Sequence, residues 1–231
     1  MDPTSPDVLE AVDRQTELLV ATTLSIEDPD APSLCEGWSR GHVLTHLARN
    51  ADGLATLVRS ALDGTGEAMY ASPEARDADI EAGAGRTCTE LLRDVEVSAA
   101  ALGEQLPRLT ADHADLRLER TPGVFLVKAG RIPFMRLREV AYHHVDLDAG
   151  FTFADVEPKL QRRFLDDEVR RLRATETPPD LTLRSTEGEE WSVGAGTASV
   201  VGSSAGLLGW LARGLTDGVS GDPLPELPQG R

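Results

Sequence analysis

The longest helical pattern in this sequence extends from residue 40 to about residue 63, and it limits the folds available to the chain. Ser39 is placed to cap the helix, and Asp63–Gly64 marks its end. Residues that recur every three or four positions define one face: His42, Val43, His46, Leu47, Asn50, Leu54, Leu57 and Ala61. A largely apolar face of this length has to pack against other helices, so the pattern predicts a helical bundle.

Three more segments in the first 150 residues have the same period, and they predict the other helices of a four-helix bundle. They cover residues 4–25, 87–105 and 132–148, and Thr87 with Glu90 forms a capping-box pattern. The polar stretch 64–86 predicts a functional loop or lid with a short helix near residues 72–81. Residues 107–131 contain several Pro and Gly residues and predict irregular structure.

The pattern changes near residue 152. A highly charged helix is predicted for residues 155–174, and residues 181–194 alternate like two short strands around a Glu-Gly turn. A third strand and a last helix, opened by Ser203 and Ser204, follow. We therefore predict an α+β protein with a helical domain, residues 1–152, and a smaller α/β domain, residues 153–231.

Charge and composition exclude several classes of function. The formal net charge of −16 repels phosphate backbones, so we expect no nucleic-acid partner. No run approaches the ~18 apolar residues of a membrane span, and no signal peptide is evident at the amino terminus. The two cysteines form no disulfide framework, which favours a reducing, cytoplasmic setting. No long apolar face is left over, which favours a monomer.

One pair of residues in the last bundle helix suggests a metal site. Glu139 and His143 are four residues apart, so they share a helix face and can bind one ion together. A third ligand has to come from a facing helix, where His46 and His42 are the candidates. The residues alone leave two ordinary alternatives open: a polar surface pair for Glu139 and His143, and a core or surface histidine for His46.

For other polar residues near this pair, the sequence gives weaker indications of a role in the metal site. Asp146 and Asp148 could orient a ligand from behind, although loop residues at a helix end are the simpler interpretation. His144 points roughly 100° away from His143, so we expect it in the core or behind the ligands. Two imidazoles and one carboxylate leave a tetrahedral zinc ion with an open position, as catalysis requires.

Three stretches of the chain resemble the mycothiol-dependent maleylpyruvate isomerase family. They are GWSRGHVLTHLARNADGL, MYASPEARDADIEAGAGR and RLREVAYHHVDLDAG. The carboxy-terminal SSAGLLGWLARG is also similar to that family, and the resemblance covers nearly the whole chain in the same order. It implies a DinB-like four-helix bundle followed by a small α/β domain. The middle stretch is the most specific of the motifs.

The resemblance also implies roles for particular residues. His46, Glu139 and His143 match the ligands of a zinc ion or another divalent metal, whereas His42 has no ligand role in the family. Arg76 matches an arginine at the active-site pocket, and Arg213 matches a carboxy-terminal arginine that reaches the same cleft. Here Arg213 precedes Gly214, whereas the family often has Gly-Arg at the end of this helix.

The implied reaction is the cis–trans isomerisation of maleylpyruvate, a dianion, to fumarylpyruvate in aromatic catabolism, with mycothiol as a recycled cofactor. Thiolate addition makes the double bond single, so it can rotate before the thiol leaves. Arginines can hold the carboxylates of the substrate, and Cys35 and Cys88 are not needed as nucleophiles. The alternatives are a zinc-dependent mycothiol S-transferase, a non-catalytic binding module and a hydrolase that uses metal-bound water.

Overall fold

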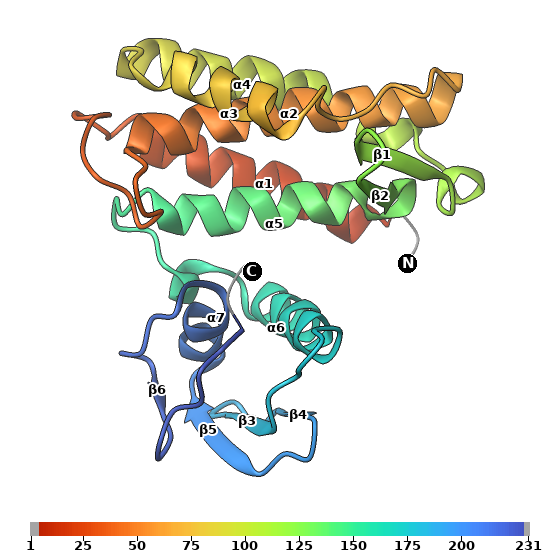
Figure 1. Ribbon diagram of the computed structural model, residues 1–231. Coiled ribbons are helices and arrows are strands. Elements are labelled where there is room, and N and C mark those ends of the chain that lie inside the picture. Colours follow the sequence, from red (N-terminus) through yellow and green to blue (C-terminus); the bar gives the residue numbers. More distant parts are fainter. Residues whose placement is uncertain (1–4, 229–231) are drawn as a thin grey trace. The chain divides into compact units, whose positions relative to one another are not determined.

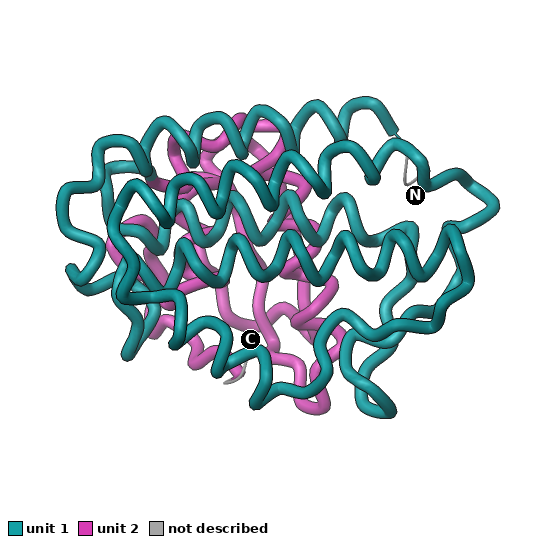
Figure 2. The backbone as a smooth tube through the Cα atoms, turned by 90° about the horizontal axis from the view of Figure 1, so that it is seen from above, with its two compact units in different colours: residues 1–151 teal, residues 152–231 magenta. Residues whose placement is uncertain are grey.

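The protein has a mixed α+β fold, seen in a computed structural model that describes residues 5–228 (Figure 1). The chain divides into two compact units, Met1–Phe151 and Thr152–Arg231, which Figure 2 shows in different colours. The first unit contains the helical bundle, and the second contains a small sheet with helices.

Four long helices form the bundle of the first unit, in agreement with the four periodic segments of the sequence. Their bounds are α1 Pro6–Thr23, α2 Arg40–Asp63, α4 Cys88–Gly103 and α5 Ile132–Asp146. Helix α2 contacts both α4 and α5, and α1 closes the bundle against α5 and α4. The bundle core at this end consists of aliphatic side chains from all four helices, with Leu19, Leu44, Leu47, Leu91 and Val140 at its centre.

The ends of α2 follow from local chemistry. The Ser39 side chain accepts a hydrogen bond from the backbone N–H of His42, and the His42 side chain accepts one from the backbone of Ser39. This capping box satisfies two backbone donors that would otherwise have no partner. Gly64 ends the helix with a φ of 69°, a left-handed conformation that suits glycine.

A short helix, α3 (Pro73–Ala84), lies unusually close to α2. A Cβ atom on Gly83 would stand 2.4 Å from Cγ2 of Thr45, and one on Gly41 would stand 2.2 Å from the carbonyl oxygen of Ala84. Both contacts are too short for any residue larger than glycine, so two glycines permit the close approach. This packing brings the polar stretch after α2 back onto the helix that carries His46.

The prediction of irregular structure for residues 107–131 was wrong in part. The segment contains an antiparallel hairpin, β1 (Arg117–Thr121) paired with β2 (Phe125–Lys128). Gly123 turns the chain with a φ of 69°. The strands lack a clear alternation of polar and apolar residues, because the adjacent apolar residues Phe125 and Leu126 are both exposed.

The second unit combines two helices with a four-stranded sheet. Its elements are α6 Pro158–Arg173, β3 Leu181–Ser185, β4 Glu190–Val193, β5 Ala198–Gly202, α7 Ser204–Arg213 and β6 Val219–Ser220. The strand order is β4-β3-β5-β6, with β3 and β5 parallel and the other pairs antiparallel. The two residues of β6 are too few to give a periodic signal in the sequence.

Among the described residues, no helix combines the length and apolar character that a membrane crossing requires.

Candidate metal centre

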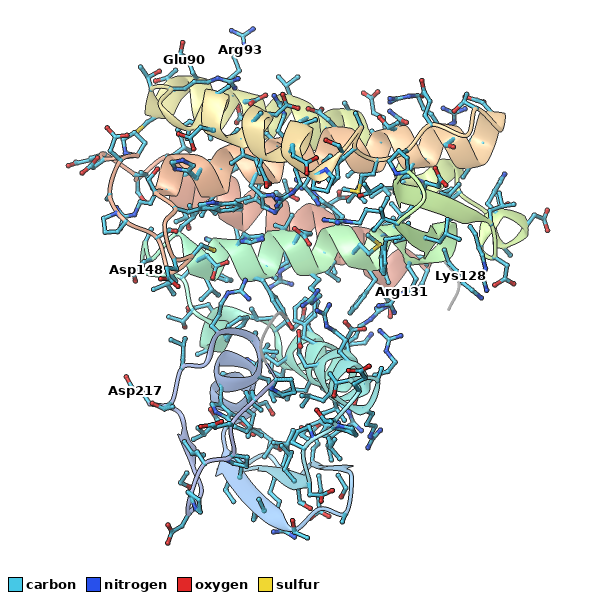
Figure 3. The ribbon with its side chains drawn as sticks, viewed as in Figure 1. Glu90, Arg93, Lys128, Arg131, Asp148 and Asp217 are labelled. Atoms are coloured by element: carbon cyan, nitrogen blue, oxygen red, sulfur yellow. The ribbon has the colours of Figure 1, made fainter. Side chains whose placement is uncertain are left out.

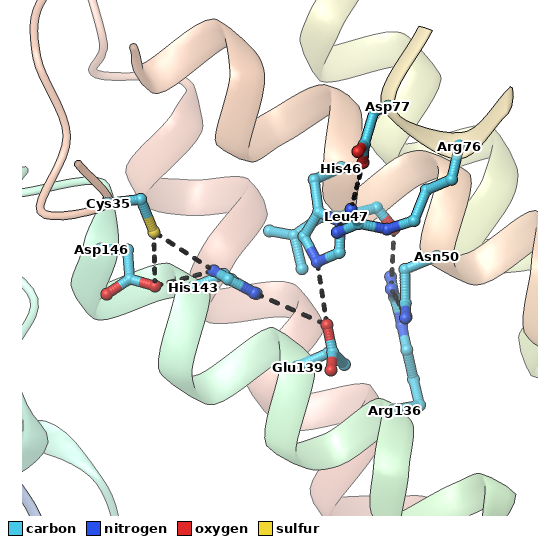
Figure 4. Close-up of polar contacts among 10 residues, drawn as sticks. All are labelled: Cys35, His46, Leu47, Asn50, Arg76, Asp77, Arg136, Glu139, His143 and Asp146. Carbon is cyan, nitrogen blue, oxygen red and sulfur yellow. Dashed lines mark hydrogen bonds and ion pairs between the residues drawn. The ribbon is translucent and has the colours of Figure 1, made fainter. Parts of the chain in front are cut away.

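Three side chains of the bundle converge on one point, and they are the three that the sequence pattern proposed as ligands. His46 comes from α2, and Glu139 and His143 come from α5 (Figure 4). Oε2 of Glu139 lies 2.9 Å from Nε2 of His46 and 3.6 Å from Nε2 of His143. One potential ligand atom from each residue lies within 4.8 Å of the other two.

The burial of His46 determines its charge. Its exposed fraction is 4%, and burial lowers the pKa of its imidazole to about 4 in spite of the hydrogen bond with Glu139. His46 is therefore neutral at pH 7, as a metal ligand has to be. Burial raises the pKa of Glu139, but the hydrogen bonds with His143 and His46 outweigh it and hold the pKa well below the ordinary value. Glu139 is therefore ionised.

His143 has the opposite electrostatic setting. Burial lowers the pKa of its imidazole, but hydrogen bonds with Asp146, Cys35 and Glu139 more than compensate, so the pKa is raised well above the ordinary value. Without a metal the ring carries a proton at neutral pH. A metal ion that binds His143 has to displace that proton.

Two residues lie behind His143: Asp146, which the sequence offered as a residue that could orient a ligand, and Cys35, for which it suggested no role. Oδ2 of Asp146 lies 2.7 Å from Nδ1 of His143, and Sγ of Cys35 lies 3.3 Å from the same oxygen. Asp146 is fully buried, so the simpler interpretation of Asp146 as a loop residue was wrong. For Asp148 that interpretation agrees with the structure, because this residue is exposed at the end of α5 (Figure 3).

Arg76, a predicted pocket residue, lies against the other histidine. Its Nη2 is 3.2 Å from Nδ1 of His46, and its Nη1 donates to the exposed carboxylate of Asp77 at 2.6 Å. The guanidinium carbon is 6.0 Å from the ring centroids of both Trp38 and Tyr70. Two aromatic faces and one imidazole therefore hold this cation beside the centre.

Trp38 forms a wall beside the two imidazoles. Its ring centroid lies 5.5 Å from that of His46 and 6.5 Å from that of His143. A signal for this residue was present in the sequence, since Trp38 directly precedes the cap of α2 within the stretch GWSRGH. A large apolar ring at this place reduces the access of water to the ligand atoms.

Arg136 is a second residue that the sequence analysis missed. It is 1% exposed, and its Nη1 donates to the carbonyl of Leu47 at 2.8 Å and to Oδ1 of Asn50 at 3.0 Å. Burial lowers the pKa of the guanidinium to about 10, and the negative charge of Glu139 opposes that shift. Arg136 is thus a buried cation one helical turn from Glu139, and its spacing of three residues from Glu139 was the available signal.

The remaining candidate residues, His42, His144 and Arg213, are not part of the cluster of His46, Glu139 and His143. His42 belongs to the capping box, and its Nε2 lies 3.1 Å from Oε2 of Glu81. His144 is fully buried, with Nε2 2.7 Å from Oγ1 of Thr22, as expected for a core residue. Arg213 lies on α7 of the second unit, where its Nη1 donates to the carbonyl of Ala212, and its role in the cleft stays a prediction.

The chemistry of the donor set fits a divalent metal. Two imidazole nitrogens and one carboxylate oxygen are good zinc donors and leave a fourth position open. The fit requires one rearrangement. Arg76 can only donate to Nδ1 of His46, so the proton of that ring is on Nε2 and points to Glu139. Metal binding through Nε2 moves the proton to Nδ1, and Arg76 then has to give up this contact.

The fold and this cluster define a class of protein: a four-helix bundle with two histidines and a glutamate from facing helices, followed by a small α/β unit. Residues 9–148 match the mycothiol maleylpyruvate isomerase N-terminal domain family. The match covers more than half of the chain, and the chain belongs to this family.

Two crystal structures are similar to the whole chain, one of the mycothiol-dependent maleylpyruvate isomerase and one of a histidine-to-alanine mutant of it. The first is 28% identical to this chain and the mutant 27%. In both comparisons the TM-score is 0.86, with 96% of this chain and 95% of the other chain covered. A search of curated proteins gave no significant match.

Proposed function

We propose that the protein is a zinc- and mycothiol-dependent isomerase that converts maleylpyruvate to fumarylpyruvate. The observation that supports this most is the convergence of His46, Glu139 and His143 in a chain of this family. These three side chains hold the metal, and another divalent ion with the same preference for nitrogen and oxygen ligands is compatible with the site.

A metal bound there would hold the thiol of mycothiol as a thiolate, whose reversible addition would turn the double bond of the substrate into a single bond that can rotate. The protein side chains provide the surrounding chemistry. Arg76, which lies beside His46, binds a carboxylate of the dianionic substrate. Trp38 limits the access of water beside the two histidines.

Charge supports the role of Arg76. A net charge of −16 repels a dianion at long range, so the pocket needs local cations to bind one. The guanidinium of Arg76 is next to the ligand cluster and is only partly shielded from solvent. A planar guanidinium can bind a carboxylate through two hydrogen bonds. Arg213 is the second proposed carboxylate-binding residue, on the resemblance alone.

Metal content tests the first part of the proposal. The wild type, His46→Ala and His42→Ala are purified without added metal or chelator and examined by elemental analysis. We expect about one zinc per chain in the wild type and in the His42→Ala control, and none in His46→Ala. A folded wild type that takes up no divalent metal, even when zinc is offered, leaves a non-catalytic binding module.

Thiol turnover tests the second part. Maleylpyruvate is supplied in large excess over mycothiol, and both the isomer formed and the free thiol remaining are measured. We expect many conversions per thiol and no loss of free thiol, since the thiol leaves at the end of each cycle. Consumption of one thiol per product identifies an S-transferase instead.

A further inference from the structure

We propose that Asp146 and Cys35 form a positioning network behind His143, which fixes the imidazole so that its Nε2 is the nitrogen presented to the metal. This inference rests on the proposed metal site. Neither residue is placed among the three ligands, and both act through the ring of His143.

The geometry around Nδ1 of His143 is well defined. Oδ2 of Asp146 lies 2.7 Å from Nδ1 of His143 and 3.3 Å from Sγ of Cys35 (Figure 4). An ionised carboxylate only accepts hydrogen bonds, so the ring N–H and the thiol S–H both donate to this one oxygen. Asp146 therefore holds the proton on Nδ1, and Nε2 is the nitrogen that faces Glu139 and would face the metal.

Two structural features fix the carboxylate in place. Asp146 is the last residue of α5, three positions after His143, so the two side chains share a helix face. Its own backbone carbonyl accepts a hydrogen bond from the N–H of Leu34 at 2.9 Å, which ties the Cys35 loop to the end of the helix. Within that loop the N–H of Trp38 donates to the carbonyl of Cys35 at 3.0 Å.

The burial of Asp146 makes its role specific. A fully buried carboxylate loses its hydration, and hydrogen bonds have to compensate for that loss. Part of the compensation comes from two donors: the ring N–H of the ligand His143 and the thiol of Cys35 in the neighbouring loop. A histidine ligand that donates its second N–H to a carboxylate has a fixed tautomer, a fixed ring orientation and a more basic ligand nitrogen.

An alternative use of the same side chains has to be excluded. Sγ of Cys35, a ring nitrogen of His143 and a carboxylate oxygen of Asp146 also lie within 4.8 Å of one another, so they could ligate an ion themselves. Such an ion would take Nδ1 of His143, so this use and the positioning role exclude each other. The 2.7 Å separation of Nδ1 and Oδ2 is that of a charge-assisted hydrogen bond.

The test measures zinc affinity by competition with a chromogenic chelator, for the wild type, Asp146→Asn and Asp148→Asn. Asp148 is the matched control, since it is an exposed aspartate two residues further on. We expect Asp146→Asn to bind zinc about 10- to 100-fold more weakly, and Asp148→Asn to bind as the wild type does. Equal affinity of all three chains overturns the positioning role and leaves the metal site standing. Failure of the wild type to bind zinc refutes the proposed function itself.

A second measurement needs no change at Asp146, in case Asp146→Asn does not fold. The wild type is loaded with cobalt(II) for absorption spectroscopy, and a zinc-loaded sample with 15N-labelled histidine is examined by NMR. We expect ligand-field bands without a thiolate-to-cobalt charge-transfer band, and His143 protonated at Nδ1 and metal-bound at Nε2. A charge-transfer band that disappears in Cys35→Ser but not in Cys88→Ser shows ligation by Cys35 and overturns the proposal.

Discussion

His143 and His46 face the same carboxylate of Glu139, but the groups behind the two rings have opposite charge. Behind His143 lies the carboxylate of Asp146, at 2.7 Å from Nδ1. Behind His46 lies the guanidinium of Arg76, at 3.2 Å from Nδ1. The pKa of His143 is raised well above its ordinary value by its hydrogen bonds, while burial lowers the pKa of His46 to about 4.

This difference shows that the two histidines are not equally ready to bind a metal ion. The ring of His143 already has its proton on Nδ1, where a metal-bound imidazole needs it. The ring of His46 has its proton on Nε2, so metal binding reverses this arrangement and releases Arg76. The ring of His143 is thus already oriented for the metal, whereas the ring of His46 is coupled to Arg76, the arginine that we expect to bind substrate.

Removal of the shared acceptor has the largest expected effect. In Glu139→Gln the anionic ligand that both histidines share is lost. We expect zinc affinity to fall by more than the roughly 100-fold that loss of an outer hydrogen-bond partner produces. Isothermal titration calorimetry measures this, with the exposed Glu96→Gln on α4 as control. Affinity within tenfold of the wild type would contradict the ligand role.

The pH dependence of zinc binding distinguishes the contributions of His143 and His46. The pKa of His143 lies well above 6.5, so metal binding at neutral pH has to release a proton from this ring, whereas His46, with a pKa of about 4, is already neutral. As the pH falls from 8 to 6, we expect zinc affinity to drop about tenfold per unit, for one displaced proton. Competition titrations at several pH values measure the slope. A zinc affinity that does not change between pH 8 and pH 6 would show that His143 releases no proton when the metal binds.

Arg76→Gln tests the coupling on the side of His46. Loss of a cation removes repulsion of the metal, so we expect zinc affinity to stay unchanged or to rise by up to about tenfold. Loss of a charged hydrogen bond to the substrate should raise the KM for maleylpyruvate by about 10- to 100-fold. Arg76→Lys is the control, because it keeps the charge and loses the paired hydrogen bonds. Weaker zinc binding in Arg76→Gln would place this arginine in support of the metal instead.

Cys35→Ser should have the smallest effect. Serine keeps a donor for Asp146, so we expect zinc affinity and isomerase activity within about threefold of the wild type. The comparison with Cys88→Ser corrects for general effects of thiol removal. A folded, zinc-loaded Cys35→Ser without activity would mean that the protein uses its own thiol as nucleophile.

The sequence predicted the parts of the fold that depend on local spacing. The helices α2 and α5, the cap of α2 at Ser39 and the end of α2 at Gly64 all agree with the observed structure. The hairpin at residues 117–128 was not predicted, because its exposed apolar residues obscure the alternation of a strand. The contact of Arg76 with His46 depends on the close approach of two helices at Gly41 and Gly83, which no single segment encodes.

The sequence by itself determined that Glu139 and His143 share a face, because the helical repeat is a local property of four consecutive residues. The tertiary structure decided that His46, 93 positions from Glu139 in the chain, meets them while His42 does not. It also decided between Asp146 and Asp148, which a sequence pattern cannot distinguish at a helix end. The reason is physical: burial and partnership depend on which loop packs over that end, and here the backbone of Leu34 and the thiol of Cys35 cover Asp146.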